Sequence, residues 1–148
     1  MLAISVTGEF YPCIRYMQYA LGYKREPMLI GDVDRGIESK NKNKYLIQLK
    51  GITRSSQSTD ECFNCNVGSG CSWCTAFNYS EFGTPNKRAT FICMMHKVRV
   101  AANCYYWNKL YKKLNLDDIF HLNLNKETCL RFMSEDEYIE LLDLQEGR

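Results

Sequence analysis

Two closely spaced pairs of cysteines are the residues best suited to chemistry in this sequence. Each pair has the form Cys-x2-Cys, which suits a loop around one metal ion or cluster because both thiolates and some backbone amides then face the same point. Gly68 and Gly70 separate the pairs and allow the tight turns that converging sulfurs need. The sequence therefore predicts a metal or cluster site whose thiols are Cys62, Cys65, Cys71 and Cys74.

The five-residue gap between the two pairs distinguishes two kinds of site. Two zinc-binding pairs normally lie about 12 to 20 residues apart, so that each approaches a tetrahedral ion from its own side. A short, crowded run is more typical of an iron-sulfur cluster whose final ligand arrives from a distance. Cys93, 19 residues beyond Cys74, is placed to be that ligand. A structural zinc module that uses the four crowded cysteines and mediates protein contacts is the alternative.

Length, charge and hydropathy limit the class of protein. The 148 residues predict one compact domain. A net charge of +2, from 19 basic and 17 acidic residues, gives no field of one sign, which argues against nucleic acid and membrane as partners. The sequence has no run of 18 apolar residues and no basic-then-apolar leader, which predicts a cytoplasmic protein. In that compartment eight cysteines favour metal binding over a disulfide framework.

The predicted fold class is α+β, with an N-terminal β-hairpin and short helix, the cysteine-rich loop, a long amphipathic helix and a C-terminal helix. Residues 2–15 contain two β-rich runs around Gly8, which predict the hairpin. Cys13 follows Pro12 at the end of the second strand, where its thiol either points into a site or is buried. Residues 16–22 predict a short helix or turn that ends at a glycine.

The long helix is predicted from about residue 86 to residue 114. Apolar residues and thiols recur there at intervals of three and four, which places Cys93 and Cys104 on the inward face. His96 follows Cys93 on the same face, either as a hydrogen-bond donor to a cluster sulfide or as a packed helix residue. A capping box at Ser134 predicts the last helix. The cysteines expected in the core are Cys104 and Cys129.

Three segments before the cysteine loop have less definite patterns. Residues 28–33 predict a short strand, followed by a turn at 34–36. Residues 38–44 are polar and predict a solvated connection, whose lysines either contact a substrate or form plain surface. Residues 45–49 fit either a strand or the first turn of a helix.

Taken together, these motifs resemble the SPASM domain, the auxiliary iron-sulfur region at the C-terminal end of many radical SAM enzymes. The residues that carry this resemblance are the spaced cysteines, residues 8–13 and residues 30–33. The flanking motifs are similar to the radical SAM peptide maturases associated with CXXX-repeat peptides, and comprise residues 78–88, Cys93-x2-His96 and residues 105–108. The resemblance spans about residues 3–110. It implies a SPASM-like domain over residues 1–114 and a helical extension of the same unit over residues 115–148.

The resemblance implies that one four-iron four-sulfur cluster is bound by Cys62, Cys65, Cys71 and Cys93. Cys13 and Cys74 would correspond to ligands of a second cluster. The usual second cysteine near Cys13 is absent, and Gly36 stands at another of the usual cysteine positions. Two thiols cannot hold a cubane, so this second shell would need a further group such as Cys104, Asp32, Asp34 or His96.

Radical SAM chemistry also needs a Cys-x3-Cys-x2-Cys motif, which this sequence does not contain. The chain is therefore expected to be the C-terminal portion of a peptide maturase, either a fragment or a separately encoded piece, and not to be catalytic alone. Its partners would be a radical SAM core domain or subunit, which would bind S-adenosylmethionine, and a ribosomally made precursor peptide. The auxiliary cluster would transfer electrons or position that peptide. The side chains expected to bury it are Trp73, Phe77, Phe91 and Trp107.

Overall fold

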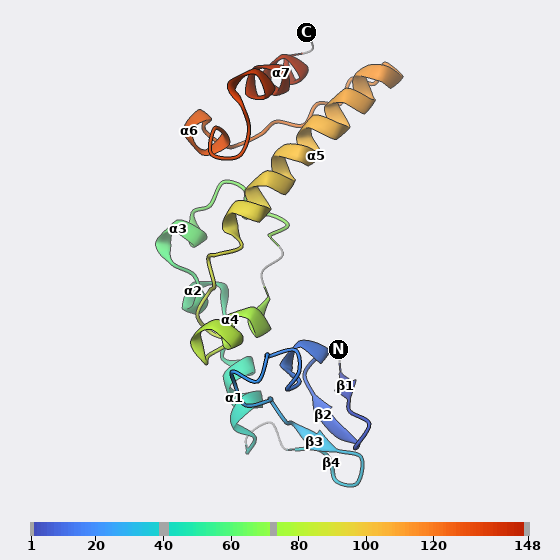
Figure 1. The fold of residues 1–148 in the computed structure, drawn as a ribbon, viewed down its shortest axis with the longest axis vertical. Coiled ribbons are helices and arrows are strands. Elements are labelled where there is room, and N and C mark those ends of the chain that lie inside the picture. Colours follow the sequence, from blue (N-terminus) through green and yellow to red (C-terminus); the bar gives the residue numbers. More distant parts are fainter. Residues whose placement is uncertain (1, 39–41, 72–73, 147–148) are drawn as a thin grey trace. The chain divides into compact units, whose positions relative to one another are not determined.

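The computed structural model describes residues 2–38, 42–71 and 74–146. The chain divides into two compact units (Figure 1). Helices predominate, and a small antiparallel sheet lies in the N-terminal part, so the predicted α+β class is confirmed. Unit 1 comprises Met1–Phe63 and Trp73–Ala89, and unit 2 comprises Asn64–Ser72 and Thr90–Arg148.

The sheet of unit 1 is an antiparallel meander. Gly31 pairs with Phe10 on one side and with Ile37 on the other. A glycine is required there, because a Cβ would lie 2.1 Å from the carbonyl oxygen of Gly36. The hairpin predicted for residues 2–15 is confirmed, whereas the predicted strand over 28–33 is shorter than expected. The strands, in their order across the sheet, are β1 (Ala3–Ile4), β2 (Glu9–Tyr11), β3 (Gly31–Asp32) and β4 (Gly36–Ile37) (Figure 1).

Buried apolar and aromatic side chains form the core of unit 1. The rings of Tyr16 and Tyr79 lie 5.9 Å apart, and the Tyr79 hydroxyl donates a hydrogen bond to the carbonyl of Glu26 over 2.9 Å. Tyrosines suit such a core because the ring buries a large apolar area while the hydroxyl finds a polar partner. The core cluster consists of Tyr16, Leu21, Met28, Ile30, Tyr45, Ala76 and Tyr79.

Short helices complete unit 1. Asn43 begins the first α-helix, because its Oδ1 accepts hydrogen bonds from the N–H groups of Tyr45 and Leu46 over 2.9 and 3.1 Å. Residues 45–49 are therefore helical. Within the connection predicted to be solvated, residues 39–41 lie outside the described residues, and Asn43 is buried, contrary to that prediction. The helices are η1 (Ile14–Tyr16), α1 (Lys44–Lys50), α2 (Arg54–Gln57), α3 (Asp60–Phe63) and α4 (Thr75–Phe82).

The long helix α5 (Cys93–Leu114) begins at Cys93 and not at about residue 86, as predicted. In a helix over that stretch, the carbonyl of Pro85 would accept from the N–H of Ala89. Instead, both groups pair with the buried side chain of Asn78. Its Nδ2 donates to the Pro85 carbonyl over 3.0 Å, and its Oδ1 accepts from the Ala89 N–H over 2.8 Å. The asparagine therefore occupies both groups of the first hydrogen bond that a helix beginning at residue 86 would make.

Besides the segment Asn64–Ser72, unit 2 contains α5, α6 (Lys126–Cys129), α7 (Glu135–Gln145) and their connections, with α7 packed against α5 (Figure 1). The capping box at Ser134 is confirmed, since Ser134 and Glu137 exchange side-chain to backbone hydrogen bonds. Among the described helices, none combines the length and apolar composition that crossing a membrane requires. The buried residues of unit 2 are Val67, His96, Ala101, Cys104, Asn108, Cys129 and Leu141.

Candidate metal centre

The loop that carries Cys65 and Cys71 is folded by two successive turns. The Gly68 N–H donates to the carbonyl of Cys65 over 3.0 Å, and the Cys71 N–H donates to the carbonyl of Gly68 over 3.2 Å. Gly70 has a φ of 70°, in the left-handed region that residues with a Cβ rarely adopt. Both thiols are half-buried. Gly68 and Gly70 thus both lie in the tight turns that the sequence predicts.

A buried histidine fixes this loop to α5. His96 is 7% exposed, and its Nε2 lies 2.6 Å from the carbonyl oxygen of Val67, a buried residue of the loop. Its Nδ1 lies 2.9 Å from a guanidinium nitrogen of Arg99. Arginine can only donate, so Nδ1 must accept, and the proton of the neutral ring is on Nε2, which donates to Val67. His96 is therefore a packed helix residue and not a donor to a cluster sulfide. Both of its ring nitrogens are already engaged, so neither can bind a metal.

Cys93 is the first residue of α5 and belongs to the same unit as Cys65 and Cys71. Its backbone N–H donates to the carbonyl of Thr90 over 3.0 Å, and its side chain is half-buried. His96 lies one helical turn further along the same face. The first turn of α5 holds no acidic residue, so the positive end of this 22-residue helix is not neutralised there. A negatively charged ligand set is electrostatically favoured at such a helix end.

The two outer cysteines of the crowded run belong to unit 1. Cys62 lies in α3, where its N–H donates to Oγ1 of Thr59 over 3.2 Å. Cys74 is the N-cap of α4, and its carbonyl accepts from the N–H of Asn78 over 3.2 Å. In the sequence each stands three residues from a cysteine of the loop.

Cys13 and Cys74 share one neighbour in unit 1, the buried Tyr16. Both half-buried side chains pack against the core cluster that contains Tyr16. The Tyr16 hydroxyl donates to Oγ1 of Thr75 over 2.7 Å. Burial raises the pKa of Tyr16 well above its ordinary value, and the charges of Cys74 and Cys13 act in the same direction. The two thiols assigned to a second cluster therefore both lie near Tyr16.

The eight free cysteines fall into two groups by burial. Cys104 and Cys129 are buried, and burial raises the pKa of each thiol, which opposes the thiolate form that metals bind. Both therefore have the core role predicted for them. The half-buried group is the donor set that the sequence assigned to clusters, and consists of Cys13, Cys62, Cys65, Cys71, Cys74 and Cys93.

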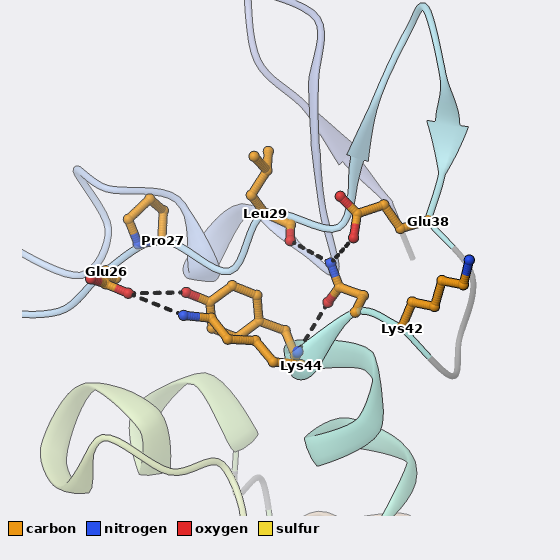
Figure 2. Close-up of a pocket in the computed structure, with 8 residues that line it drawn as sticks. Glu26, Pro27, Leu29, Glu38, Lys42 and Lys44 are labelled. Carbon is orange, nitrogen blue, oxygen red and sulfur yellow. Dashed lines mark hydrogen bonds and ion pairs between the residues drawn. The ribbon is translucent and has the colours of Figure 1, made fainter.

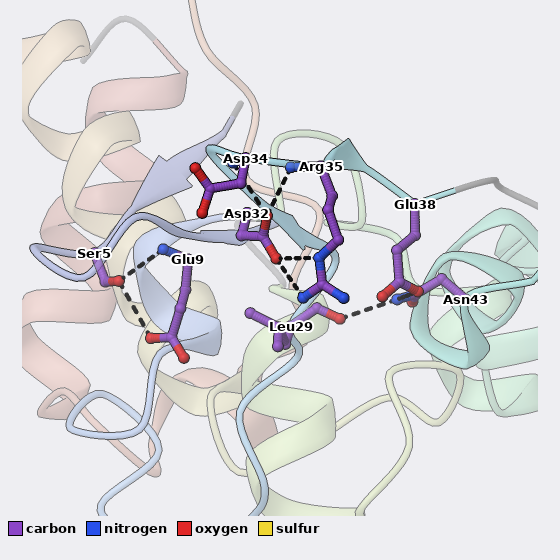
Figure 3. A network of polar contacts seen from close by, with 8 residues as sticks. All are labelled: Ser5, Glu9, Leu29, Asp32, Asp34, Arg35, Glu38 and Asn43. Carbon is purple, nitrogen blue, oxygen red and sulfur yellow. Dashed lines mark hydrogen bonds and ion pairs between the residues drawn. The ribbon is translucent and has the colours of Figure 1, made fainter.

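Over residues 2–38, 42–71 and 74–146, no three or more Cys, His, Asp or Glu side chains are grouped so as to hold a metal ion. The carboxylate of Asp32 is also engaged elsewhere (Figure 3). The Arg35 guanidinium donates to it over 2.6 and 2.9 Å, and these hydrogen bonds hold the pKa of Asp32 below its ordinary value. Asp32 therefore does not complete a shell with Cys13 and Cys74.

The aromatic side chains expected to bury a cluster are partly exposed. Phe91 is 63% exposed, and Phe77 and Trp107 are exposed as well, whereas Trp73 lies outside the described residues. The guanidinium carbon of Arg15 lies 4.9 Å from the ring centroid of Phe77. The ring of Trp107 contacts two tyrosine rings of its own helix, Tyr106 and Tyr111. Phe77, Phe91 and Trp107 are thus exposed themselves, and their covering of a cluster stays a prediction.

A hollow in unit 1, of about 580 Å³, is lined by Lys42 and Lys44, two of the lysines of residues 38–44, whereas Lys40 lies outside the described residues (Figure 2). Lys44 Nζ lies 3.4 Å from the carboxylate of Glu26, which also accepts a hydrogen bond from the Tyr45 hydroxyl over 3.3 Å. Nδ2 of Asn43 donates to Leu29 and to Glu38. These polar groups pair with one another across the hollow, which fits the alternative of a plain surface.

No protein-family model matches this chain, and no curated protein or solved structure matches it either. The SPASM resemblance therefore stays a prediction, as does the division into residues 1–114 and 115–148. The structure itself shows cysteines that form no disulfide, six of them half-buried, and a hydrogen bond that holds the loop of Cys65 and Cys71 to α5.

Proposed function

We propose that this chain binds an iron-sulfur cluster through cysteine thiolates and is the auxiliary-cluster and peptide-docking portion of a radical SAM peptide maturase. The hydrogen bond from His96 to the Val67 carbonyl carries the proposal. It fixes the loop that contains Cys65 and Cys71 to the helix that begins with Cys93. Three thiols assigned to one cluster thus belong to one compact unit.

The ligands of the proposed four-iron four-sulfur cluster are Cys62, Cys65, Cys71 and Cys93. When bound, such a cluster would accept and pass on single electrons at a potential set by its burial and by hydrogen bonds to its sulfurs. The chain itself positions the thiolates, and His96 keeps the loop in place. The proposal includes one cluster, because Cys13 and Cys74 are too few for a second cubane and Asp32 is held by Arg35.

Cleavage of S-adenosylmethionine is assigned to a radical SAM core domain or subunit, since the motif for it is absent from this sequence. The other proposed partner is a ribosomally made precursor peptide. In this assignment the chain supplies an electron carrier and a docking surface, not the site of radical formation.

Two substitutions distinguish the iron-sulfur cluster from a zinc site. Cys93→Ser removes a cluster ligand and should abolish most iron binding after anaerobic reconstitution, whereas Cys74→Ser should retain it. A zinc site built from the four crowded cysteines predicts the reverse order of metal loss. Cys104→Ala, which removes a buried core thiol, serves as the control for loss of a thiol as such. Absence of both iron and sulfide from the reconstituted wild-type protein would refute the proposal.

A further inference from the structure

Unit 2 contains a polar hollow of about 470 Å³ beside the cysteine loop. One wall is Asn66, which stands between Cys65 and the anchored Val67. Among the described residues that line the hollow none is ionisable, so it has no charge with which to select a phosphate, a carboxylate or a metal ion. The other wall is the segment between α5 and α6 and consists of Leu122, Asn123, Leu124 and Asn125.

The second wall presents main-chain groups that lack a partner. Upstream, the N–H of Leu122 donates to Oε1 of Gln145 over 2.9 Å. Within the part of the chain that the structure describes, the backbone N–H and carbonyl groups of Asn123 and Leu124 make no hydrogen bond. The segment is neither helix nor strand, and at Asn125 its backbone is extended. Such groups can pair with an added extended chain, as the edge of a sheet does.

This protein already uses asparagine side chains to pair with its own main chain. The buried Asn108 donates to the carbonyl of Phe120 over 2.9 Å and accepts from the Phe120 N–H over 2.8 Å. An asparagine amide offers the same donor and acceptor as a peptide group, so it can replace a neighbouring strand. In the hollow, Asn66 and Asn123 are exposed, and within the described residues their side chains have no partner.

We propose that this hollow binds an extended, uncharged peptide segment through its main chain. The amides of Asn66 and Asn123 and the free backbone groups of Asn123 and Leu124 pair with its peptide bonds. Because the lining is neutral and rich in amides, recognition depends on the peptide backbone and tolerates different side chains. This site rests on the peptide-docking part of the proposed function and gives it a location, but it needs only the fold of unit 2 and no bound metal. With a cluster present, the peptide would lie beside the loop that carries Cys65.

The test is a titration of the full-length, 15N-labelled chain with a capped pentapeptide of alternating valine and threonine. We expect saturable chemical-shift changes at the backbone amides of residues 122–125 and at the side-chain amides of Asn66 and Asn123. The same peptide with N-methylated backbone amides should bind at least tenfold more weakly, because it has the same side chains but lacks the donors. No saturable change, changes confined to other residues, or equal binding of the methylated peptide would each overturn the proposal.

Two variants test the same site from the protein side. Asn66→Ala and Asn123→Ala should each weaken binding about tenfold, since each removes up to two hydrogen bonds. Asn103→Ala, at an exposed asparagine of α5 outside the hollow, should leave binding unchanged. Unchanged binding in both hollow variants would contradict the proposal. All three variants retain every cysteine, so their iron content tests the proposed cluster separately. Peptide binding without iron would refute the cluster. Iron binding without peptide binding would refute this peptide site.

Discussion

Unit 1 and unit 2 are stabilised by different kinds of interior. Unit 1 buries large side chains around one cluster, including Leu21, Met28 and three tyrosines. In the described part of unit 2, the buried residues are mostly small or polar, such as Ala101, Cys104 and Asn108. Burial of apolar area contributes about 25 cal/mol per Å². The hydrophobic effect therefore stabilises unit 2 less than unit 1.

This difference explains why unit 2 depends on directed polar contacts. His96 holds the cysteine loop to α5, and Asn108 holds the connection at Phe120. Small units with a limited core are commonly stapled by disulfides or by a metal. All eight cysteines of this chain are free. A thiolate-bound cluster at the loop would supply a cross-link in place of a disulfide, which is consistent with the proposed function.

The largest expected effect is on the interior of unit 1. Met28 is fully buried, so Met28→Ala should lower the free energy of unfolding by about 2–5 kcal/mol through lost burial and the cavity that remains. Met95→Ala, at a methionine 72% exposed on α5, is the matched control and should change it by less than about 0.5 kcal/mol. Urea denaturation measures the free energy of unfolding of each variant. Hydrogen exchange should show the loss in α1 and α4, and equally faster exchange in α5 and α7 would contradict the distinction between the units.

Polar anchoring of unit 2 predicts the next largest effect. His96→Ala should lower the free energy of unfolding by about 1–3 kcal/mol, because it leaves the buried Val67 carbonyl without its donor. It should also speed hydrogen exchange over residues 64–71. His96→Gln keeps a donor at the same reach and should recover part of the protection. Equal exchange in wild type and His96→Ala would show that the loop is held by something else.

The cap of α7 predicts a smaller effect within unit 2. Ser134→Ala removes the side-chain acceptor of the Glu137 N–H and should lower the free energy of unfolding by about 1 kcal/mol. Ser134→Asp retains an acceptor at the cap and should stay close to wild type. Thermal denaturation followed by circular dichroism measures both. A decrease as large as that of Met28→Ala would mean that unit 2 depends on α7 far more than its small interior indicates.

Alkaline pH should also weaken unit 1. Burial, together with the hydrogen bond from its hydroxyl to Glu9, raises the pKa of Tyr11 from 10 to about 12. The folded state therefore favours the protonated hydroxyl. Its contribution to stability is complete below pH 10 and is lost as the pH rises from 10 to about 12. Urea denaturation across this range should show a shallower decline for Tyr11→Phe than for wild type, and identical declines would contradict the prediction.

Features that depend on neighbouring residues could be predicted from the sequence. The hairpin around Gly8, the capping box at Ser134 and the core position of Cys104 all follow from local pattern, and the structure confirms them. Half-burial of the crowded thiols is likewise consistent with their spacing.

Features that depend on contacts between distant residues could not be predicted. Nothing in the local pattern near Pro85 shows that Asn78 captures its carbonyl and delays the start of α5. The amphipathic period places His96 inward but does not reveal its partner, Val67, 29 residues earlier. The exposure of Phe91 likewise depends on the packing around it, which the local pattern does not give.

The most direct test of the central claim is the metal and sulfide content of the full-length chain after anaerobic purification and reconstitution, recorded with its absorption spectrum. The proposed cluster predicts about four iron and four sulfide per chain and a broad absorption band near the visible edge. One zinc per chain with neither iron nor sulfide would contradict the account and make the cysteine loop a structural zinc site.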